Sequence, residues 1–465
     1  MALVRESNLS RKHSARHAAF ELLKAVHHDG AYANIVWPRI LRHSGLDEQD
    51  RRFATELAYG ALRMGGQLEA VLEVARGKKM SSVEAPIRWV LVLGAYQLLY
   101  LSTPHHAAVS ESVTLISEVG KSRAKGLVNA ILRRVSEKST DEWLDQLSSL
   151  TDNDDAKLGA RYAHPTWVVT KLRAALRREG AESELESLLS AHNVPARVTA
   201  AILPGLADIN PEDQRTPYSP LGVYLSGDPR NDSRIAAGTA RIQDEGSQLA
   251  ALVASRALSL SPGDRVLDAC SGPGGKTAVL AADASRAQAS VVATEIQPHR
   301  AKLVKESVSA LPGGVVSVHA TGVSEFLEEG GPFERILLDA PCLGLGALRR
   351  RPEARWSKSI DDLAELNHTQ HTLLDRCLDA LGPGGELVYV TCSPVVEETT
   401  DVISQALERH PDVDALDTAS LVNSVARVPL ADIAVGTAVQ LWPHRHNTDA
   451  MFIQALKKRD DSLDT

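Results

Sequence analysis

The stretch RVLDACSGPGGKTAVLA, residues 265–281, has the pattern of a short buried strand, a glycine-rich turn and the start of a helix. Glycines at 272, 274 and 275 let the backbone approach a ligand closely, and the first turn of the helix favours a polar or anionic group. The same pattern without a ligand would be an ordinary helix-starting turn. The neighbouring segments therefore decide what this unit belongs to.

Four more short apolar runs follow, each separated from the next by a helical stretch. They are SVVATEI (290–296), GVVSVHA (314–320), RILLDAPC (335–342) and GELVYVTC (385–392). Strands that alternate with helices predict a parallel, doubly wound sheet with right-handed crossovers. Ligands of such sheets bind at the carboxyl ends of the strands. We therefore expect an α/β, Rossmann-like domain over residues 241–465, with its site at that edge.

The first part of the chain has a helical pattern instead. Apolar residues recur at helical spacing over residues 14–37 and 50–75, and residues 87–101 are apolar nearly all round, which is typical of a central helix. No strand pattern interrupts this part. We expect an all-α domain over residues 1–139.

Residues 140–240 are expected to form a linker and an N-terminal extension of the α/β domain. A polar, acidic stretch with one short helix comes first, followed by helices over 165–180 and 181–193 and a strand over 196–203. Residues 206–240 are rich in Pro, Gly, Asp and Ser, which indicates loops.

Composition narrows the class of protein. A length of 465 residues predicts two or three domains, and 43% hydrophobic with 24% charged residues is ordinary for a globular protein. We find no secretory signal and no apolar run of the ~18 residues that a membrane span needs. Four cysteines are too few for a disulfide framework. We therefore expect a cytoplasmic protein whose cysteines are thiols, with no membrane partner.

The net charge of −8 conceals an asymmetry. Residues 1–139 hold 20 Lys and Arg against 13 Asp and Glu, whereas the remainder holds 31 against 46. A basic module on an acidic body favours an anionic partner, and RNA is the usual one. A solvated helical surface is the alternative.

Three classes of cofactor bind to a glycine turn of this kind. A Walker A loop needs glycine five residues before the Gly275–Lys276 pair, where this chain has Cys270. A dinucleotide fingerprint needs a third glycine, where this chain has Thr277. S-Adenosyl-L-methionine remains, and Glu295, which ends the next strand, suits its ribose hydroxyls.

Two cysteines, Cys342 and Cys392, lie just past the ends of predicted strands, so we expect both thiols at one edge of the sheet. A thiolate that adds to carbon 6 of cytosine makes carbon 5 reactive toward a methyl donor. Asp339 is suited to hydrogen-bond the base, and Lys276 to orient that carboxylate or a cysteine. A pyrimidine must be unstacked to be reached, so the substrate should be flipped or single-stranded.

Other interpretations of the cysteines stay open. Cys342 and Cys392 would also suit two ligands of a metal, or a redox pair, although neither lies in a C-x-x-C motif. Cys377, in a helical pattern, is interpreted as a small buried apolar residue, and Cys270 as a small residue of the cofactor turn. Their positions alone do not rank Cys342 against Cys392.

A run of three arginines, Arg349, Arg350 and Arg351, follows the predicted active edge. These side chains are suited to hold RNA phosphates, and Trp356 is available to stack on a base. The alternative is a solvated loop.

The motifs together resemble a known family. DACSGPGGKT, LLDAPCLGLGALRRRPE and ELVYVTCSP look like motifs I, IV and VI of the RNA cytosine-5 methyltransferases, and residues 242–253 resemble the segment before motif I. The helical start resembles the NusB-like domain fused to this enzyme in the bacterial RsmB, Sun or Fmu family, which methylates small-subunit (16S) ribosomal RNA. The resemblance covers residues 14–457. It implies an all-α NusB-like domain followed by a Rossmann-like methyltransferase domain.

The resemblance also implies roles for individual residues. Cys392 would be the nucleophile, while Cys342 would assist proton removal and product release. Glu295 would hold the cofactor's ribose, with Asp339 near the methyl-transfer centre. The turn that would wrap the cofactor consists of Cys270, Ser271, Gly272, Pro273, Gly274, Gly275 and Lys276.

The chain departs from the family pattern in places. Leu343 and Leu345 replace the usual small residues after the DAPC motif, which predicts a differently shaped base pocket. Thr321 stands where an acid usually meets the adenine.

We expect a monomeric enzyme that uses S-adenosyl-L-methionine and no metal to methylate cytosine in small-subunit ribosomal RNA. A transfer-RNA cytosine-5 methyltransferase, a non-catalytic RNA-binding or assembly factor, and a thiol or metal protein are the alternatives.

Overall fold

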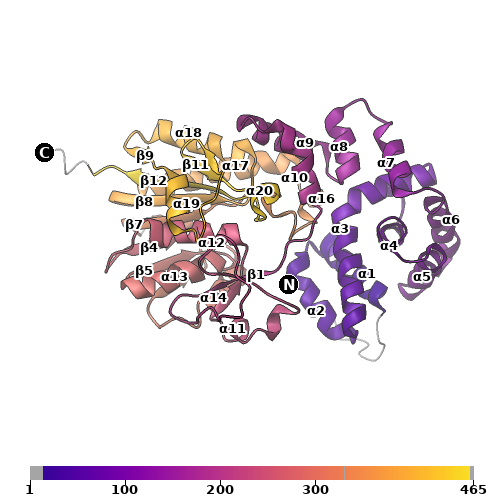
Figure 1. Cartoon of the computed structure of the whole chain (residues 1–465), viewed down its shortest axis with the longest axis horizontal. Helices are drawn as coiled ribbons and strands as arrows, with labels where there is room; N and C mark the ends of the chain where they lie inside the picture. Colours follow the sequence, from indigo (N-terminus) through magenta and orange to yellow (C-terminus); the bar gives the residue numbers. More distant parts are fainter. Residues whose placement is uncertain (1–13, 329, 461–465) are drawn as a thin grey trace. The chain divides into compact units, whose positions relative to one another are not determined.

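The computed structural model of the chain describes residues 14–328 and 330–460. The start of the predicted domain 1–139 and the end of the predicted domain 241–465 therefore lie outside the described residues. The chain forms two compact units (Figure 1). The first consists of Met1–Thr170 with Arg350–Lys358, and the second of Lys171–Arg349 with Ser359–Thr465. The expected linker is therefore divided between the two units, because its helices pack with one unit or the other.

The first unit is helical, as predicted. Its helices are α1 (Ala15–Asp29), α2 (Ala33–Ser44), α3 (Glu48–Arg76), α4 (Ala85–Tyr100), α5 (His105–Glu118), α6 (Lys125–Val135), α7 (Thr140–Ser148), α8 (Asp154–Tyr162), the start of α9 (Thr166–Arg178) and the short α16 (Ala354–Ser357). The apolar α4 contacts α1, α3, α5 and α6, which confirms the prediction of a central helix. Burying it on all sides removes its apolar surface from water, which stabilises the unit.

A short segment from the α/β part of the sequence completes this unit. Trp356 donates its indole N–H to the carbonyl oxygen of Arg63 at 3.2 Å, and its ring lies against two glycines of α3, Gly65 and Gly66. The guanidinium of Arg351 lies 4.5 Å from the ring centre of Tyr32. Trp356 thus packs against α3, whereas its sequence position suggested stacking on a base.

The second unit contains the predicted sheet. Its parallel strands are β4 (Arg265–Asp268), β5 (Ser290–Thr294), β6 (Val316–His319), β7 (Phe333–Asp339) and β8 (Leu381–Thr391), in the order β8-β7-β4-β5-β6. All five predicted strands are confirmed. The sheet is mixed, however, because β12 (Phe452–Lys458) pairs antiparallel with β8 and carries β9 (Val413–Ala415), β11 (Ala438–Gln440) and β10 (Ala434–Val435) beyond it. Strands of two or three residues are too short to show a period in the sequence.

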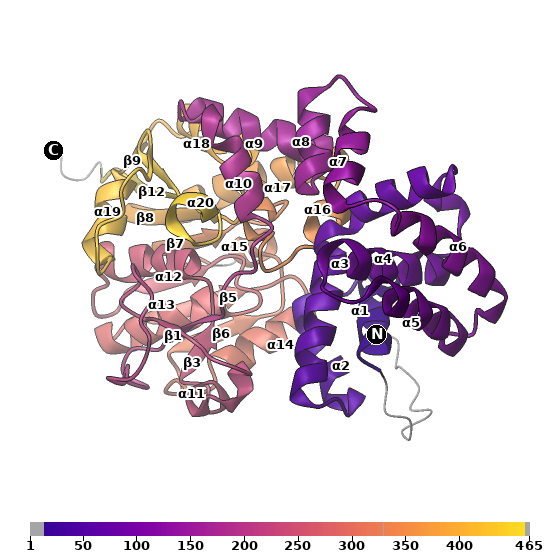
Figure 2. The same cartoon turned by 45° about the vertical axis from the view of Figure 1, so that its right-hand side comes forward.

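Helices cover both faces of this sheet (Figures 1 and 2). On one face, α12 (Glu245–Leu252), α13 (Gly275–Ala287) and α19 (Thr418–Val425) pack against residues such as Leu337 and Val388. On the other, α17 (Ile360–Asp379) and α18 (Thr400–Arg409) pack against residues such as Ile336 and Tyr389. Neighbouring strand residues point to opposite faces, so both faces are apolar, and their cover by helices on each side is the doubly wound arrangement that the sequence predicted.

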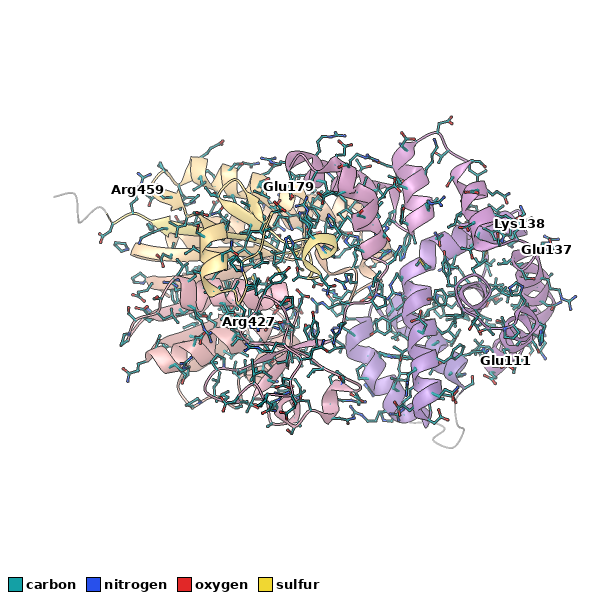
Figure 3. All side chains as sticks on the ribbon, viewed as in Figure 1. Glu111, Glu137, Lys138, Glu179, Arg427 and Arg459 are labelled. Carbon is teal, nitrogen blue, oxygen red and sulfur yellow. The ribbon has the colours of Figure 1, made fainter. Side chains whose placement is uncertain are left out.

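The remaining elements lie around this core. They are α10 (Leu185–Ala191), α11 (Ser233–Ala236), α14 (Pro298–Ser307), α15 (Val323–Leu327), α20 (Pro443–His446) and a small antiparallel sheet of β1 (Thr199–Ile202), β2 (Gly222–Tyr224) and β3 (Ala240–Ile242). Just past β12, Arg459 forms an ion pair with Asp414 of β9 at 2.8 Å (Figure 3). Among the helices that the structure describes, none is long and apolar enough to cross a membrane.

Gly66 tests the packing of the inserted segment. A Cβ atom at Gly66 would lie 2.2 Å from the Trp356 ring, whereas one at the neighbouring Gly65 would lie 3.7 Å away, in ordinary contact. We expect Gly66→Ala to lower the free energy of unfolding by about 1–3 kcal/mol, because the indole must move. The matched variant Gly65→Ala should be neutral or gain about 0.5–1 kcal/mol from helix propensity. Denaturant unfolding measures both, and equal stabilities of the two variants would contradict this packing.

Candidate active site

The two strand-end cysteines meet at the carboxyl edge of the sheet. The strands β7 and β8 are parallel neighbours, with Asp339 opposite Val390. The sulfur atoms of Cys342 and Cys392, a few residues further on, lie 3.5 Å apart. A thiol at this distance can hydrogen-bond to a neighbouring sulfur. The shared edge that the sequence predicts therefore brings the two thiols into direct contact.

The backbone around the cysteines is interlocked. Gly346 donates its N–H to the carbonyl oxygen of Cys392 at 2.9 Å and accepts the N–H of Ala450 at 2.9 Å. A Cβ atom at Gly346 would lie 2.0 Å from the Ala450 oxygen, so only glycine fits here. Leu343 and Leu345, which depart from the family pattern, are 1% and 0% exposed. Their bulk therefore packs inside the protein.

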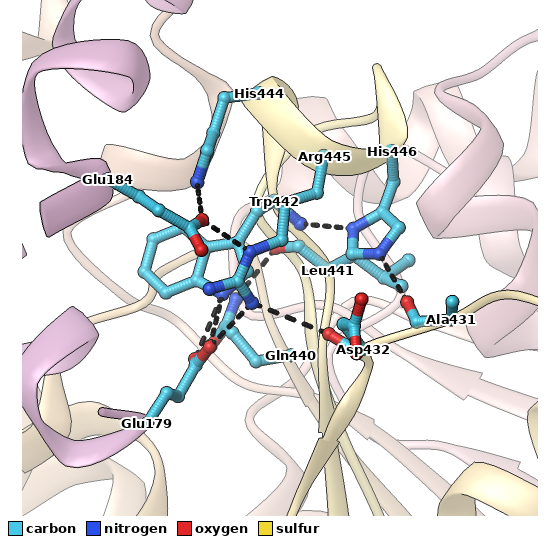
Figure 4. A network of polar contacts seen from close by, with 10 residues as sticks. All are labelled: Glu179, Glu184, Ala431, Asp432, Gln440, Leu441, Trp442, His444, Arg445 and His446. Carbon is cyan, nitrogen blue, oxygen red and sulfur yellow. Dashed lines mark hydrogen bonds and ion pairs between the residues drawn. The ribbon is translucent and has the colours of Figure 1, made fainter. Parts of the chain in front are cut away.

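A polar network holds the loop that contains Ala450 (Figure 4). Arg445 of α20 forms ion pairs with Glu179 at 2.8 Å and with Glu184 at 2.7 Å. The indole N–H of Trp442 also donates to Glu179 at 2.9 Å, and His444 lies 2.8 Å from Glu184. Burial raises the pKa of Glu179 despite the hydrogen bonds from Arg445 and Trp442. The network thus anchors the loop between β11 and β12 to the end of α9 and to α10.

Lys276 and Asp339 form an ion pair beside the cysteines, with 2.7 Å between Nζ and Oδ2. Burial acts to lower the pKa of Lys276, but the charge of Asp339 and its hydrogen bond outweigh burial, so this pKa is raised. The negative form of Cys392 raises it further. A cation that interacts with Cys392 in this way stabilises its thiolate.

The predicted cofactor turn connects β4 to α13. Ser271 is tied to β5, since its N–H and its hydroxyl both donate to the carbonyl oxygen of Thr294 at 2.9 Å. A Cβ atom at Gly272 would lie 1.9 Å from the carboxylate of Glu295, so a side chain there would displace this carboxylate. Glu295 accepts the N–H of Gln297 at 2.9 Å. The structure thus brings the turn and the acid at the end of β5 together.

Two buried polar atoms beside this turn lack a partner among the described residues. They are Oδ1 of Asp268, at the end of β4, and Oε1 of Gln243, whose side chain lies 3.7 Å from a Cβ placed at Gly275. Burial raises the pKa of Asp268 to about 7, against a hydrogen bond from Thr277 at 2.6 Å. Unpaired buried acceptors are costly. A cofactor with hydroxyl and amino groups, such as S-adenosyl-L-methionine, fits these residues.

The remaining predicted residues are more scattered. Arg349 is 6% exposed and donates to the carbonyl oxygen of Val194 at 3.2 Å and to Asn447 at 2.7 Å. Its assignment to RNA phosphates is therefore corrected, because the guanidinium is buried in protein contacts. Arg350 and Arg351 are partly exposed and stay predicted phosphate ligands.

Thr321 and Cys270 are the other two positions that the sequence analysis singled out. Thr321 donates to Glu325 at 2.7 Å, so a carboxylate lies next to the position where the usual acid is absent. Burial raises the pKa of the Cys270 thiol well above its ordinary value, which keeps it neutral.

Sequence reasoning missed three residues near the site: Gln243, Gln370 and Glu398. Glu398 follows Cys392 by six residues, in an acidic pair after a buried strand. Gln370 lies on α17, where helical periodicity suggests only an interior position. The sequence signal that could have identified these residues is an acidic or amide side chain at a position where the pattern predicts an apolar one.

The fold and this site define a Rossmann-like methyltransferase joined to a helical unit. Residues 255–457 match the family described as 16S rRNA methyltransferase RsmB/F, and residues 13–137 match the NusB family. A Mycobacterium tuberculosis (strain H37Rv) protein named "Putative methyltransferase Rv1407" is 42% identical over 455 residues, 96% of each chain. Ribosomal RNA small subunit methyltransferase B of Pseudomonas putida is 33% identical over 87% of this chain and 91% of its own. The chain therefore belongs to the RsmB/F family.

Solved structures agree on the fold. The crystal structure of PH0851 superposes with a TM-score of 0.79 over 95% of this chain and 97% of its own, at 21% identity. The structure of NSun6 from Pyrococcus horikoshii with SFG has a TM-score of 0.53 over 63% of this chain and 98% of its own, at 16% identity. The chain is a methyltransferase that uses S-adenosyl-L-methionine and acts on RNA, with a NusB-like helical domain.

Asp268 predicts a pH-dependent stability. Its folded-state pKa of about 7 lies above that of an unfolded aspartate, which is about 3.9. The folded state therefore binds the proton more tightly, and the contribution of Asp268 to stability falls as pH rises from about 4 to about 7. Asp268→Asn stays neutral and keeps an oxygen for Thr277. We expect its stability relative to the unmodified protein to rise by up to a few kcal/mol between pH 5 and pH 8.

Thermal unfolding at several pH values measures this difference. Asp208→Asn, at an exposed loop position, is the control for the change from Asp to Asn itself. A pH-independent difference for Asp268→Asn would mean that the buried carboxyl does not hold a proton.

Proposed function

We propose that this enzyme methylates carbon 5 of a cytosine in small-subunit ribosomal RNA through a covalent bond between Cys392 and the base. The contact of 3.5 Å between the Cys342 and Cys392 sulfurs carries this proposal. The ion pair of Lys276 with Asp339 beside them supports it. The likeness to the ribosomal RNA small subunit methyltransferase B of Pseudomonas putida supports the substrate.

In the first step, the Cys392 thiolate adds to carbon 6 of the base, which makes carbon 5 an enamine-like nucleophile. The Lys276 ammonium stabilises the thiolate before the attack. Asp339 lies next to this centre and is suited to accept a hydrogen bond from the cytosine amino group. S-Adenosyl-L-methionine, when bound, supplies the electrophilic methyl group that carbon 5 takes.

In the second step, carbon 5 gives its proton to solvent water, the electron pair of that C–H bond reforms the double bond between carbons 5 and 6, and Cys392 leaves carbon 6 as a thiolate. The hydrogen bond with Cys392, together with burial, raises the pKa of Cys342 well above its ordinary value, so Cys342 is a neutral thiol. A thiol proton facing the Cys392 sulfur stabilises the departing thiolate. Cys342 therefore assists release of the product.

The NusB-like unit is proposed to dock RNA. Exposed cations gather on and just before α6 and are Arg123, Lys125, Arg133 and Arg134. Phosphate contacts of this kind provide affinity without sequence preference. We place the enzyme in the cytoplasm and propose that it acts as a monomer without a metal.

Nucleoside analysis tests the reaction. Purified protein, labelled S-adenosyl-L-methionine and unmodified small-subunit ribosomal RNA should yield 5-methylcytidine. Cys392→Ala should lower this yield by at least ~10⁴-fold, because the nucleophile is lost, while cofactor binding survives. Cys342→Ala should accumulate a covalent protein–RNA adduct that is stable in a denaturing gel.

Cys377→Ala, at a buried position on α17, is the matched control and should keep turnover. Retained turnover in Cys392→Ala would remove the nucleophile assignment. Label in transfer RNA alone would keep the chemistry and change the substrate.

Salt dependence tests the docking surface. We expect the double variant Lys125→Glu with Arg133→Glu to weaken binding of the full chain to RNA and to reduce the slope of log affinity against log salt by about 2. Lys24→Glu with Lys78→Glu makes the same change of net charge elsewhere on the unit. Equal losses in the two double variants would assign the effect to net charge alone.

A further inference from the structure

A buried carboxylate, Glu398, lies next to the loop of Cys342. Its Oε1 atom accepts the backbone N–H of Leu343, the residue after Cys342, at 2.8 Å. The same residue comes six positions after Cys392, in the short helix Val396–Glu398. Glu398 is fully buried, and its backbone carbonyl accepts the hydroxyl of Tyr389 from β8 at 3.0 Å. The carboxylate is therefore fixed to one cysteine's strand and bonded to the other cysteine's loop.

Gln370 of α17 completes the arrangement. Its Nε2 donates to Oε1 of Glu398 at 3.2 Å and to the carbonyl oxygen of Pro341 at 2.8 Å. Pro341 and Leu343 flank Cys342. The side chains of Gln370 and Glu398 therefore hold the backbone on both sides of this cysteine. Gln370 is also fully buried. The steps of the proposed reaction use neither of these two contacts.

The surroundings of Glu398 indicate that this residue does more than fill space in the core. Burial raises the pKa of Glu398, and the hydroxyl of Ser393 and the N–H of Leu343 act against this rise. Burying a carboxyl group is costly, and an apolar residue of similar volume would fill the space at lower cost. Ser393 directly follows Cys392, so the groups around this carboxyl come from the loops of both cysteines.

We propose that Glu398 is a positioning residue that, with Gln370, holds the Cys342 thiol against the Cys392 sulfur so that the covalent RNA adduct breaks down. This inference rests on the proposed function. Release depends on a thiol proton placed at the leaving sulfur, and such placement is sensitive to shifts of about 1 Å. Formation of the adduct depends on Cys392 and Lys276, whereas the hydrogen bonds of Glu398 to Leu343 and of Gln370 to Pro341 act on the loop of Cys342.

The test separates formation of the adduct from its breakdown. Single-turnover reactions of the full chain with small-subunit ribosomal RNA and S-adenosyl-L-methionine measure gel-stable adduct and released 5-methylcytidine over time. We expect Glu398→Ala to slow release at least ~10-fold while adduct formation changes less than ~3-fold. Adduct should therefore accumulate, as in Cys342→Ala.

Two further variants define the cause. Glu398→Gln keeps an oxygen for the Leu343 N–H and should restore release to within about 3-fold of the unmodified enzyme. Glu397→Ala, at the neighbouring position whose carboxylate pairs with Lys171, is the matched control and should leave both rates unchanged. If thermal unfolding shows that Glu398→Ala does not fold, Gln370→Leu is used in its place. This variant should show the same selective loss of release.

Several outcomes would overturn the inference. A parallel loss of adduct formation and release in Glu398→Ala would show a merely structural role, and unchanged rates would show none. Release as slow in Glu398→Gln as in Glu398→Ala would assign the effect to charge and not to position. Failure of the proposed function looks different, because Cys342→Ala would then form no adduct and Cys392→Ala would keep its turnover.

Discussion

Parallel pairing of β7 with β8 is the constraint on which the active site depends. The register sets Asp339 opposite Val390. The backbone turns after each of the two strands so that the sulfur atoms of Cys342 and Cys392 lie 3.5 Å apart. Backbone hydrogen bonds of Gly346 to Cys392 and to Ala450 keep the loops at this separation. Because a parallel pair needs a crossover, α17 lies between the two strands in sequence and covers their face. The same crossover provides Gln370 to the loop of Cys342.

The charge states of the side chains in the site follow from their burial and from the groups next to them. Lys276 stays charged because Asp339 faces it, and its ammonium favours the Cys392 thiolate. Cys342 stays a neutral thiol because it is buried and shares a hydrogen bond with Cys392. In the proposed reaction these surroundings give two chemically identical side chains opposite tasks, one as nucleophile and one as proton donor. This division suits a reaction in which a sulfur–carbon bond forms first and breaks later.

Sequence reasoning was strongest where a period or a motif covered many residues. The five strands of the parallel core and the longer helices of the first unit were predicted, since their apolar periods extend over whole elements. The antiparallel strands β9, β10 and β11 were missed because they have only two or three residues each, and β12 was missed although it has seven. Arg349 was interpreted as a ligand of RNA phosphates and Trp356 as a base-stacking residue, but both donate hydrogen bonds to backbone carbonyl oxygens of the protein, which no motif encodes.

The sequence by itself determined the residues of the cofactor turn, the two strand-end cysteines and the division into a basic helical part and an acidic α/β part, because each depends on local spacing or composition. Only the tertiary structure decided which groups surround them. Glu398 reaches Leu343 across 55 positions, and Gln370 reaches Pro341 across 29. Such contacts depend on how strands and helices pack, and side-chain burial then sets the charge of each group.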